Sequence, residues 1–253
     1  MIDISVIVTL HSETVMAGPT IRSADLAIAA AESSGFSVER LFGFDNPTPE
    51  TAAFFDRDEF SSWTSATHSF RDQGQLRNAM ASQSTGRWIA FLDGDDIWSE
   101  NWLVAAATHL LEAEADGSRE IAHPEINWIF DRQANVVLKL PQDDLLFDPY
   151  AFYFTNYYDA LAMAPRAAHL DIPYAIRDIP RGFAVEDWQW NIETMAAGWR
   201  HVAIRDTIIF KRRREMSQVI RAGQRSAIFR DIEPMRIDQV GTLGQPQKGP
   251  GIC

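Results

Sequence analysis

Residues 86–98 read Gly-Arg-Trp-Ile-Ala-Phe-Leu-Asp-Gly-Asp-Asp-Ile-Trp (GRWIAFLDGDDIW), and this stretch decides the fold class. Its apolar run, 88–92, is typical of a strand that is buried on both faces. The run leads without a break into three carboxylates, Asp93, Asp95 and Asp96. Like charges that crowd at the end of a buried strand are costly unless a cation neutralises them. The stretch therefore predicts a central strand whose carboxyl end holds a ligand, and the alternative is a solvated acidic turn.

The segments around this stretch alternate between strand-like and helix-like patterns. Thr48 and Ser99 are candidate N-caps of two of the helices. Strands are expected at 4–10, 36–44, 66–70 and 87–92, and helices at 21–31, from residue 49, at 75–84 and at 103–113. Such strand–helix units predict an α/β fold with a doubly wound, mostly parallel sheet. Ligands of such sheets bind at the carboxyl ends of the strands.

The second half of the chain is less regular. We expect a hairpin of strands at 126–130 and 136–140, a helix at 185–197 and a strand at 201–210. A basic run, 211–214, follows that strand. The last residues, from 238, are rich in Gly, Pro and Gln, which is typical of a flexible tail.

Composition and charge exclude several classes of protein. The formal net charge of −12 argues against nucleic acid as a partner. No apolar run reaches the roughly 18–20 residues that a membrane-spanning helix needs, and the N-terminus lacks the pattern of a signal peptide. Cys253, the single cysteine, is the last residue, so no internal disulfide is expected. A cytoplasmic, reducing compartment is the resulting expectation.

The acidic turn suits a divalent metal ion. Carboxylate oxygens are hard ligands that favour Mg²⁺ or Mn²⁺, and these ions also bind substrate phosphates. The six histidines show no metal-ligand spacing, and the sequence has neither a Gly-x-Ser-x-Gly elbow nor a Walker-type phosphate loop. Zinc-enzyme, serine-hydrolase and P-loop interpretations are therefore poor.

Two neighbouring motifs resemble the signature of the family 2 inverting glycosyltransferases. The first is Gly-Gln-Leu-Arg-Asn-Ala at 74–79, and the second is the stretch 86–98 with its DxD-type ending. The opening strand Ser-Val-Ile-Val-Thr-Leu at 5–10 is also similar. The resemblance covers residues 3–115 well and 180–220 more loosely. It implies a GT-A fold in which residues 1–117 bind the nucleotide-sugar, 118–237 bind the acceptor and 238–253 form the tail.

The resemblance also implies roles on the donor side. Asp95 would be the principal ligand of Mn²⁺ or Mg²⁺, and Asp93 would contact the ribose or the metal shell. Three further residues would bind the nucleotide, preferably of a UDP-sugar. They are Asp45 and Glu13, at the base, and Arg77, at the nucleotide or diphosphate.

On the acceptor side, Glu186-Asp187-Trp188 resembles the family's Glu-Asp pair. Asp187 would take the proton from the acceptor hydroxyl, and Glu186 would orient it or bind the acceptor. Arg214 stands where many relatives carry a histidine, so we expect Arg214, with Arg212, to neutralise the departing diphosphate. The run 211–214 could instead be a solvated face or a peripheral contact with the inner membrane face.

These observations predict a metal-dependent inverting glycosyltransferase that uses a nucleoside-diphosphate sugar. Its acceptor would be a hydroxyl of a saccharide or lipid-linked saccharide in surface polysaccharide synthesis. A nucleotidyltransferase is one alternative, although the segment 11–18 (HSETVMAG) lacks the glycine-rich basic loop expected there. A catalytically silent sugar-nucleotide-binding or scaffold domain is the other.

Overall fold

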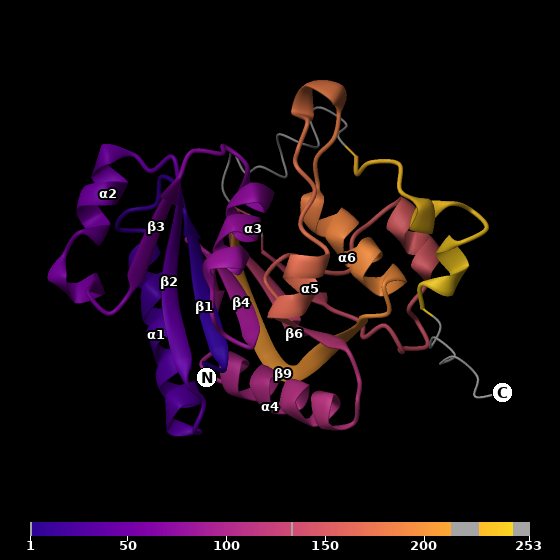
Figure 1. The fold of residues 1–253 in the computed structure, drawn as a ribbon, viewed down its shortest axis with the longest axis horizontal. Coiled ribbons are helices and arrows are strands. Elements are labelled where there is room, and N and C mark those ends of the chain that lie inside the picture. The colour runs from indigo at the N-terminus through magenta and orange to yellow at the C-terminus, as the bar shows by residue number, and fades with distance from the viewer. Residues whose placement is uncertain (1, 133, 214–227, 245–253) are drawn as a thin grey trace.

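The structure, a computed structural model, describes residues 2–132, 134–213 and 228–244 (Figure 1). The first half alternates strands and helices as expected. Its elements are β1 (Ile4–Leu10), α1 (Ala17–Ser33), β2 (Val38–Asp45), α2 (Pro49–Phe55), η1 (Asp58–Phe60), β3 (Thr64–His68), α3 (Gln73–Gln83), β4 (Trp88–Asp93), β5 (Ile97–Trp98) and α4 (Trp102–Ala115).

The second half adds strands that extend the same sheet, with two short 3₁₀ helices and a further two near the end of the described chain. Its elements are β6 (Glu120–Asp131), β7 (Asn135–Leu138), η2 (Pro149–Tyr153), β8 (Met163–Pro165), α5 (Arg166–Asp171), η3 (Ile179–Arg181), α6 (Glu186–Ala196), β9 (Arg200–Arg213), η4 (Glu233–Met235) and η5 (Val240–Thr242).

One sheet runs through the described residues in the order β3-β2-β1-β4-β8-β6-β9-β5, with β7 paired to β6. The strands β3, β2, β1 and β4 are parallel, and β6 is parallel to β9. Short antiparallel β8 joins these two groups. The α/β fold with a mostly parallel sheet is thus confirmed. The strand order reverses beside β1, so the crevice between the carboxyl ends of β1 and β4 is where such a sheet binds ligands.

Buried apolar side chains and N-cap residues define the helices. Leu103, Ala106 and Leu110 on α4 are buried as their helical spacing predicted. Thr48 caps α2, because its Oγ1 accepts the N–H of Thr51 at 3.2 Å. The expected cap of α4 was wrong. Asn101 occupies that N-cap position, since the Ser99 hydroxyl instead accepts the N–H of Ile208 from β9.

A second hydrophobic cluster covers α6 and includes the start of the expected tail. Val240 and Leu243 are buried there against side chains such as Phe152 and Ile192. Residues 238–244 are therefore packed, and the expected tail does not include them; residues 245–253 lie outside the described residues. Within the described ranges, no helix is long and apolar enough to cross a membrane.

Candidate active site

The acidic turn lies at the carboxyl end of β4, beside the end of β1. Gly94 donates its N–H to the carbonyl of Thr9 at 2.9 Å, which locks the two strand ends together. A Cβ at Gly94 would lie 2.6 Å from Cδ2 of Leu10, so only glycine fits this approach. The turn therefore places Asp93 and Asp95 beside the crevice that the strand order creates.

Asp93 is held by three donors from two elements, β1 and α3. Its Oδ1 accepts from Thr9 Oγ1 at 2.8 Å, Gln73 Nε2 at 2.7 Å and an Nη of Arg77 at 2.7 Å. Hydrogen bonds from a charged donor to a carboxylate are among the strongest in proteins. Sequence reasoning missed Thr9 and Gln73, because neither belongs to a motif that reveals its spatial neighbour. The result is a fixed carboxylate on the wall of the crevice.

Arg77 is a buried cation between the two acidic groups. Its side chain is only 4% exposed, and its guanidinium lies 2.7 Å from Asp93 and 3.9 Å from Oε1 of Glu186. Burial alone would lower the pKa of Arg77, but the nearby acidic groups, chiefly Asp93, outweigh burial and raise the pKa. Arg77 therefore stays charged and joins the β4 turn to the start of α6.

The Gly-Gln-Leu-Arg-Asn-Ala segment brings α3 and α6 close together. A Cβ at Gly74 would lie 3.1 Å from Cγ of Glu186 and 3.2 Å from Cβ of Tyr174. Two residues after Leu76, the Asn78 side chain bonds both the N–H and the carbonyl of Tyr174, at 2.8 and 2.9 Å. One short helix thus positions Arg77 and fixes the chain that leads to α6.

Helix α6 begins with the acidic pair. Val185, the preceding residue, has φ 57°, a left-handed conformation that a β-branched side chain rarely adopts. Backbone strain of this kind is found at functional sites. Burial, with the like charge of Glu186, raises the pKa of Asp187 to about 6. A carboxylate with that pKa can accept a proton near neutral pH, as a general base must.

Asp96 is buried and holds β9. It is 3% exposed; its Oδ1 accepts the N–H of Arg212 at 2.9 Å, and Nζ of Lys211 lies 3.8 Å from Oδ2. Burial raises the pKa of Asp96 to about 8, although the charge of Lys211 opposes this. Asp96 therefore connects the turn to the acceptor-side sheet.

A charge cluster that the sequence did not reveal continues from Asp96. Asp159 lies 3.2 Å from Nζ of Lys211 and 3.3 Å from Nζ of Lys139, and it accepts from Asn127 at 2.7 Å. Burial alone would raise the pKa of Asp159, but the two lysines outweigh burial and lower it. These residues come from separate segments, so only strand alternation in β9 could have predicted that Lys211 faces inward.

Asp45 has its carboxylate occupied by the loop before α3. It accepts the backbone N–H groups of Phe70 at 2.7 Å, Arg71 at 3.0 Å and Asp72 at 2.9 Å. This geometry shapes the loop that carries Gln73 toward Asp93. A contact between Asp45 and a nucleotide base stays a prediction.

Glu13 lies at the rim of the same crevice. Its carboxylate accepts the N–H groups of His11 at 2.6 Å and Ser12 at 3.0 Å. A Cβ at Gly94 would lie 3.2 Å from Cγ of Glu13, so the loop after β1 closes over the acidic turn. Glu13 is therefore near the expected nucleotide position.

Within the described part of the basic run, Lys211 lies 3.8 Å from Asp96, whereas the guanidinium of Arg212 is not brought to the acidic turn. The guanidinium of Arg212 lies 3.2 Å from Asp131 and over the ring of Phe130, 4.8 Å from its centroid. Alternation along β9 explains this, because Lys211 and Arg212 occupy opposite faces. Only the backbone N–H of Arg212 reaches Asp96. Arg214, the other expected diphosphate contact, lies outside the described residues.

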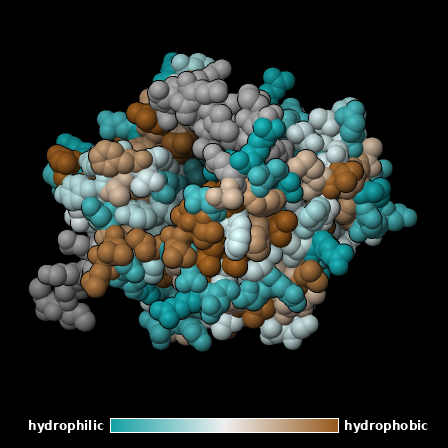
Figure 2. Space-filling model, turned by 180° about the vertical axis from the view of Figure 1, so that it is seen from behind, coloured by the Kyte–Doolittle hydropathy of each residue, from teal (hydrophilic) through white to brown (hydrophobic). Residues whose placement is uncertain are grey.

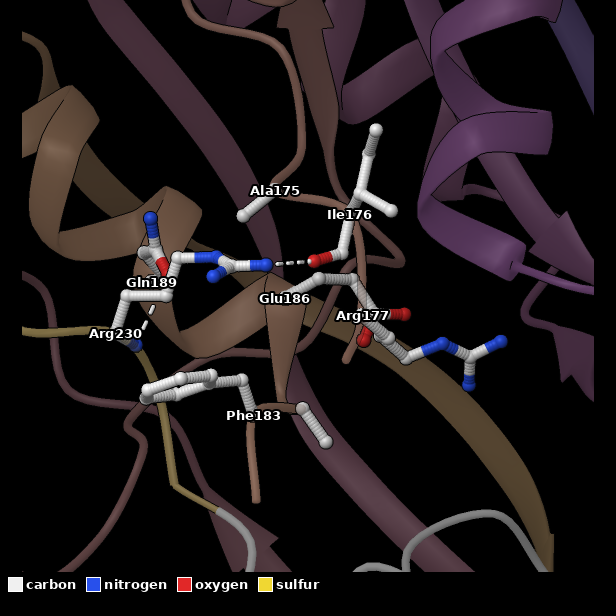
Figure 3. A pocket seen from close by; sticks show the side chains of 8 residues that line it. Ala175, Ile176, Arg177, Phe183, Glu186, Gln189 and Arg230 are labelled. Atoms are coloured by element: carbon white, nitrogen blue, oxygen red, sulfur yellow. Dashed lines mark hydrogen bonds between the residues drawn. The ribbon is translucent and has the colours of Figure 1, made fainter. Parts of the chain in front are cut away.

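A shallow hollow lies beside Glu186 on the acceptor side (Figure 3). Arg230 spans it, donating from its guanidinium to the carbonyl of Ile176 at 2.7 Å and from its N–H to Gln189 at 3.3 Å. The remaining lining residues are Ala175, Arg177, Phe183 and Ala184. The hollow adjoins the N-terminal end of α6, where an acceptor would have to approach Asp187.

Comparison with known families agrees with this geometry. The family model described as glycosyl transferase family 2 matches residues 5–142, which is more than half of the chain. The chain belongs to glycosyl transferase family 2. The match includes the acidic turn and the Arg77 helix, and it stops before α6. No curated protein matches the chain.

Solved structures confirm the GT-A fold of this family 2 chain. S. aureus TarS in complex with UDP-GlcNAc aligns with a TM-score of 0.57 at 15% identity, over 87% of this chain and 61% of that one. The mannosyltransferase PcManGT from Pyrobaculum calidifontis, in complex with GDP-Man and Mn²⁺, aligns with a TM-score of 0.57 at 13% identity, over 82% and 56%. The chain thus spans less than two thirds of either solved chain.

The donor set at the turn fits a metal ion that is shared with a substrate. Among residues 2–132, 134–213 and 228–244, no three His, Cys, Asp or Glu side chains converge on one point. Mg²⁺ and related ions are commonly bound by one or two carboxylates together with substrate phosphates and water. Asp93 and Asp95 could supply that protein share, because both end at the crevice on a turn that Gly94 keeps close to β1.

Proposed function

We propose that this glycosyltransferase moves a sugar, with inversion, from a nucleoside-diphosphate sugar to a hydroxyl of a saccharide or lipid-linked saccharide. Surface polysaccharide synthesis is the proposed setting. UDP-sugars are the preferred donors in this proposal, and Mn²⁺ or Mg²⁺ is the proposed cofactor. The uridine and guanosine nucleotides of the two solved neighbours support a nucleotide-sugar donor, and the Mn²⁺ of PcManGT supports a divalent ion.

One observation carries the proposal. Arg77 lies 2.7 Å from Asp93 and 3.9 Å from Glu186, so a single buried cation connects the donor turn to the acceptor-side helix. A transferase needs both substrates to meet within bonding distance. A domain that only binds nucleotide-sugar would not require Glu186 and Asp187 to be held at that crevice.

Charge also favours a divalent ion. The connected cluster holds the cations Arg77, Lys139 and Lys211. Its carboxylates outnumber them and are Asp93, Asp95, Asp96, Asp159, Glu186 and Asp187. A diphosphate entering this site adds further negative charge, which is costly without a counter-ion. Held by Asp95 and Asp93, Mn²⁺ or Mg²⁺ would neutralise the diphosphate and stabilise it as a leaving group.

The chain's own residues then account for the transfer. Arg77 fixes Asp93 on the donor wall, and Glu13 and Asp45 lie where the base would be bound. Asp187 accepts the proton of the acceptor hydroxyl as the hydroxyl oxygen attacks the anomeric carbon, and burial, together with the charge of Glu186, keeps the pKa of Asp187 raised. Because one nucleophile displaces the nucleoside diphosphate in one step, the anomeric configuration inverts.

Hydrolysis of donors without an acceptor tests this function most simply. UDP-glucose, UDP-GlcNAc and GDP-mannose would be incubated with the protein and Mn²⁺, with EDTA, or with neither, and released nucleotide would be measured. Release that requires Mn²⁺ supports a metal-dependent transferase. Donor binding without any release, in the presence of varied sugar acceptors, would favour a silent nucleotide-sugar-binding domain.

A further inference from the structure

The strands β7, β6 and β9 form a ribbon with two chemically different faces. Asn127 and Lys211 lie on the inner face, where both contact Asp159. Trp128 pairs with Val136 on one side and with Phe210 on the other, so these three side chains share the opposite face. The polar and charged side chains thus lie on the inner face of the ribbon, and Trp128, Val136 and Phe210 lie on the outer face.

The outer face is apolar, and within residues 2–132, 134–213 and 228–244 no secondary structure element covers it completely. The rings of Trp128 and Phe210 lie 6.1 Å apart. Trp128 is 46% exposed, Val136 51% and Leu138 64%, and their neighbours in the ribbon are half-buried. The apolar residues that share this face are Ile126, Trp128, Phe130, Val136, Leu138, Ile208 and Phe210.

An apolar sheet face of this kind marks a contact surface. On the side of the molecule hidden in Figure 1, hydrophobic residues form a band across the middle of the surface (Figure 2). Among the described residues, the short strand β7 pairs only with β6, and its Val136 and Leu138 are exposed. Exposure of these apolar side chains to water is unfavourable, so a partner that covers them would stabilise this face.

The tip of the ribbon carries positive charge. Arg132 lies beyond β6, and Arg212 and Arg213 end β9, with Asp131 as the neighbouring carboxylate. Arg213 pairs in register with Asp131, and the guanidinium of Arg212 covers the ring of Phe130. The apolar face is therefore bordered by three arginines in a protein whose formal net charge is −12.

We propose that this face docks on an anionic lipid bilayer. Its apolar side chains would enter the interface between headgroups and acyl chains, with Trp128 at the depth that tryptophan prefers. The arginines would attract anionic headgroups. A second copy is the poorer occupant, because a two-fold contact would offer the same patch, which carries three arginines and one neighbouring carboxylate, Asp131, and so supplies little negative charge to the border.

Strand directions connect this docking to the active site. β6 and β9 run parallel to each other and antiparallel to β8, which is itself antiparallel to β4. The arginine tip therefore lies at the same edge of the sheet as the Asp93 turn. Docking would hold a lipid-linked acceptor near the crevice, and this last point rests on the proposed function. The sequence indicated a membrane contact through the whole run 211–214 from its charge alone. In the structure, Lys211 faces inward and contacts Asp159.

Vesicle flotation of the full chain without donor tests the docking independently of catalysis. We would compare pure phosphatidylcholine vesicles with phosphatidylcholine vesicles that also contain the anionic lipid phosphatidylglycerol. Binding should be stronger to the anionic vesicles. Arg213→Gln should reduce that binding about fivefold, the usual effect of one arginine near such a surface. Its binding to neutral vesicles should not change.

Matched leucine variants test the apolar component. Leu138→Ser, on the face, should weaken binding to both kinds of vesicle, and Trp128→Ser should do so more strongly. Leu145→Ser, at a fully exposed leucine off the ribbon, should leave binding unchanged. Donor hydrolysis should remain normal in all three variants. Equal binding by the Leu138 and Leu145 variants, or no binding to anionic vesicles, would overturn the proposal. So would a dimer, seen by light scattering, that Trp128→Ser makes monomeric.

Discussion

The guanidinium of Arg77 lies 2.7 Å from the carboxylate of Asp93, and the Arg77 side chain is 4% exposed whereas that of Asp93 is 24% exposed. Arg77 approaches from α3 and Asp93 from the end of β4, so the pair joins two motifs that are separate in the sequence. The same guanidinium lies 3.9 Å from Glu186 at the start of α6. The donor and acceptor sides of the crevice therefore depend on one cation.

Arg77→Met should weaken binding of a nucleoside diphosphate and destabilise the fold. Removing one partner of a buried ion pair typically costs about 3–5 kcal/mol, because the remaining charge is left without compensation. Denaturant unfolding and UDP titration would measure the two effects. Arg57→Met removes an exposed partner of Glu59 and is the matched control, with little effect on either quantity. Equal behaviour of the two variants would mean that Arg77 is not an organising residue.

Asp187→Asn should abolish most turnover while donor binding survives. Asparagine keeps the shape of the side chain but cannot accept the proton, and losing a general base costs roughly two or more orders of magnitude. In the wild type, kcat/KM should fall as the pH decreases through about 6, since the pKa of Asp187 is raised to about 6 and the protonated acid is inactive. Initial rates from pH 5 to 8 check this. A profile that is flat across that range would assign the base elsewhere.

Gly74→Ala should impair turnover more than donor binding. The added Cβ would lie 3.1 Å from Glu186 and 3.2 Å from Tyr174, so α6 must shift away from α3. The required shift is a few tenths of an ångström, and since a misplacement of about 1 Å can cost roughly 10²-fold, we expect a smaller but measurable loss of turnover. Gly18→Ala on α1, where a Cβ meets nothing within 4 Å, is the control and should leave kcat unchanged. The prediction fails if both alanine variants keep wild-type kcat.

His169→Phe should raise the free energy of unfolding and make it less sensitive to a decrease in pH. His169 is buried against Trp190, and neither ring nitrogen has a hydrogen-bond partner among the described residues. Burial lowers its pKa to about 3, so the stability of the neutral form is full above about pH 6.5 and declines as the pH falls toward 3. One such group contributes a slope of up to about 1.36 kcal/mol per pH unit. Urea unfolding at pH 7.5 and 5 would detect the smaller difference expected for the variant.

The first half of the fold could be predicted because its strands are buried on both faces. Apolar runs such as 4–10 and 88–92 indicate such strands without tertiary information. Strand β6 was found only from residue 126. Its earlier part holds Glu120, whose charge is balanced by Arg200 of β9 and whose carboxylate lies 2.6 Å from Nε2 of His109 of α4. The alternation of polar and apolar residues cannot reveal a strand whose buried polar side chains pair with residues far away in the sequence.

Part of the candidate site could likewise be predicted from the sequence, and part could not. The spacing of Asp93 and Asp95 and the Glu186-Asp187 pair could be found from local sequence. The Asp159 cluster could not, because Lys139 and Lys211 reach it from different strands. The expected role of Arg212 at the diphosphate required knowledge of which face of β9 it occupies.

Metal-dependent binding of UDP is the measurement that tests the central claim most directly. Calorimetric titrations would use the wild type and Asp95→Ala, each with Mn²⁺ and with EDTA. We predict that Mn²⁺ tightens UDP binding by the wild type at least about tenfold, roughly 1.4 kcal/mol, and leaves Asp95→Ala at the weak EDTA value. Asp95→Ala should remain folded, because the variant removes one member of a repelling acidic cluster. UDP binding that is equally tight with EDTA, or unchanged in Asp95→Ala, would contradict a metal-bridged diphosphate at this turn.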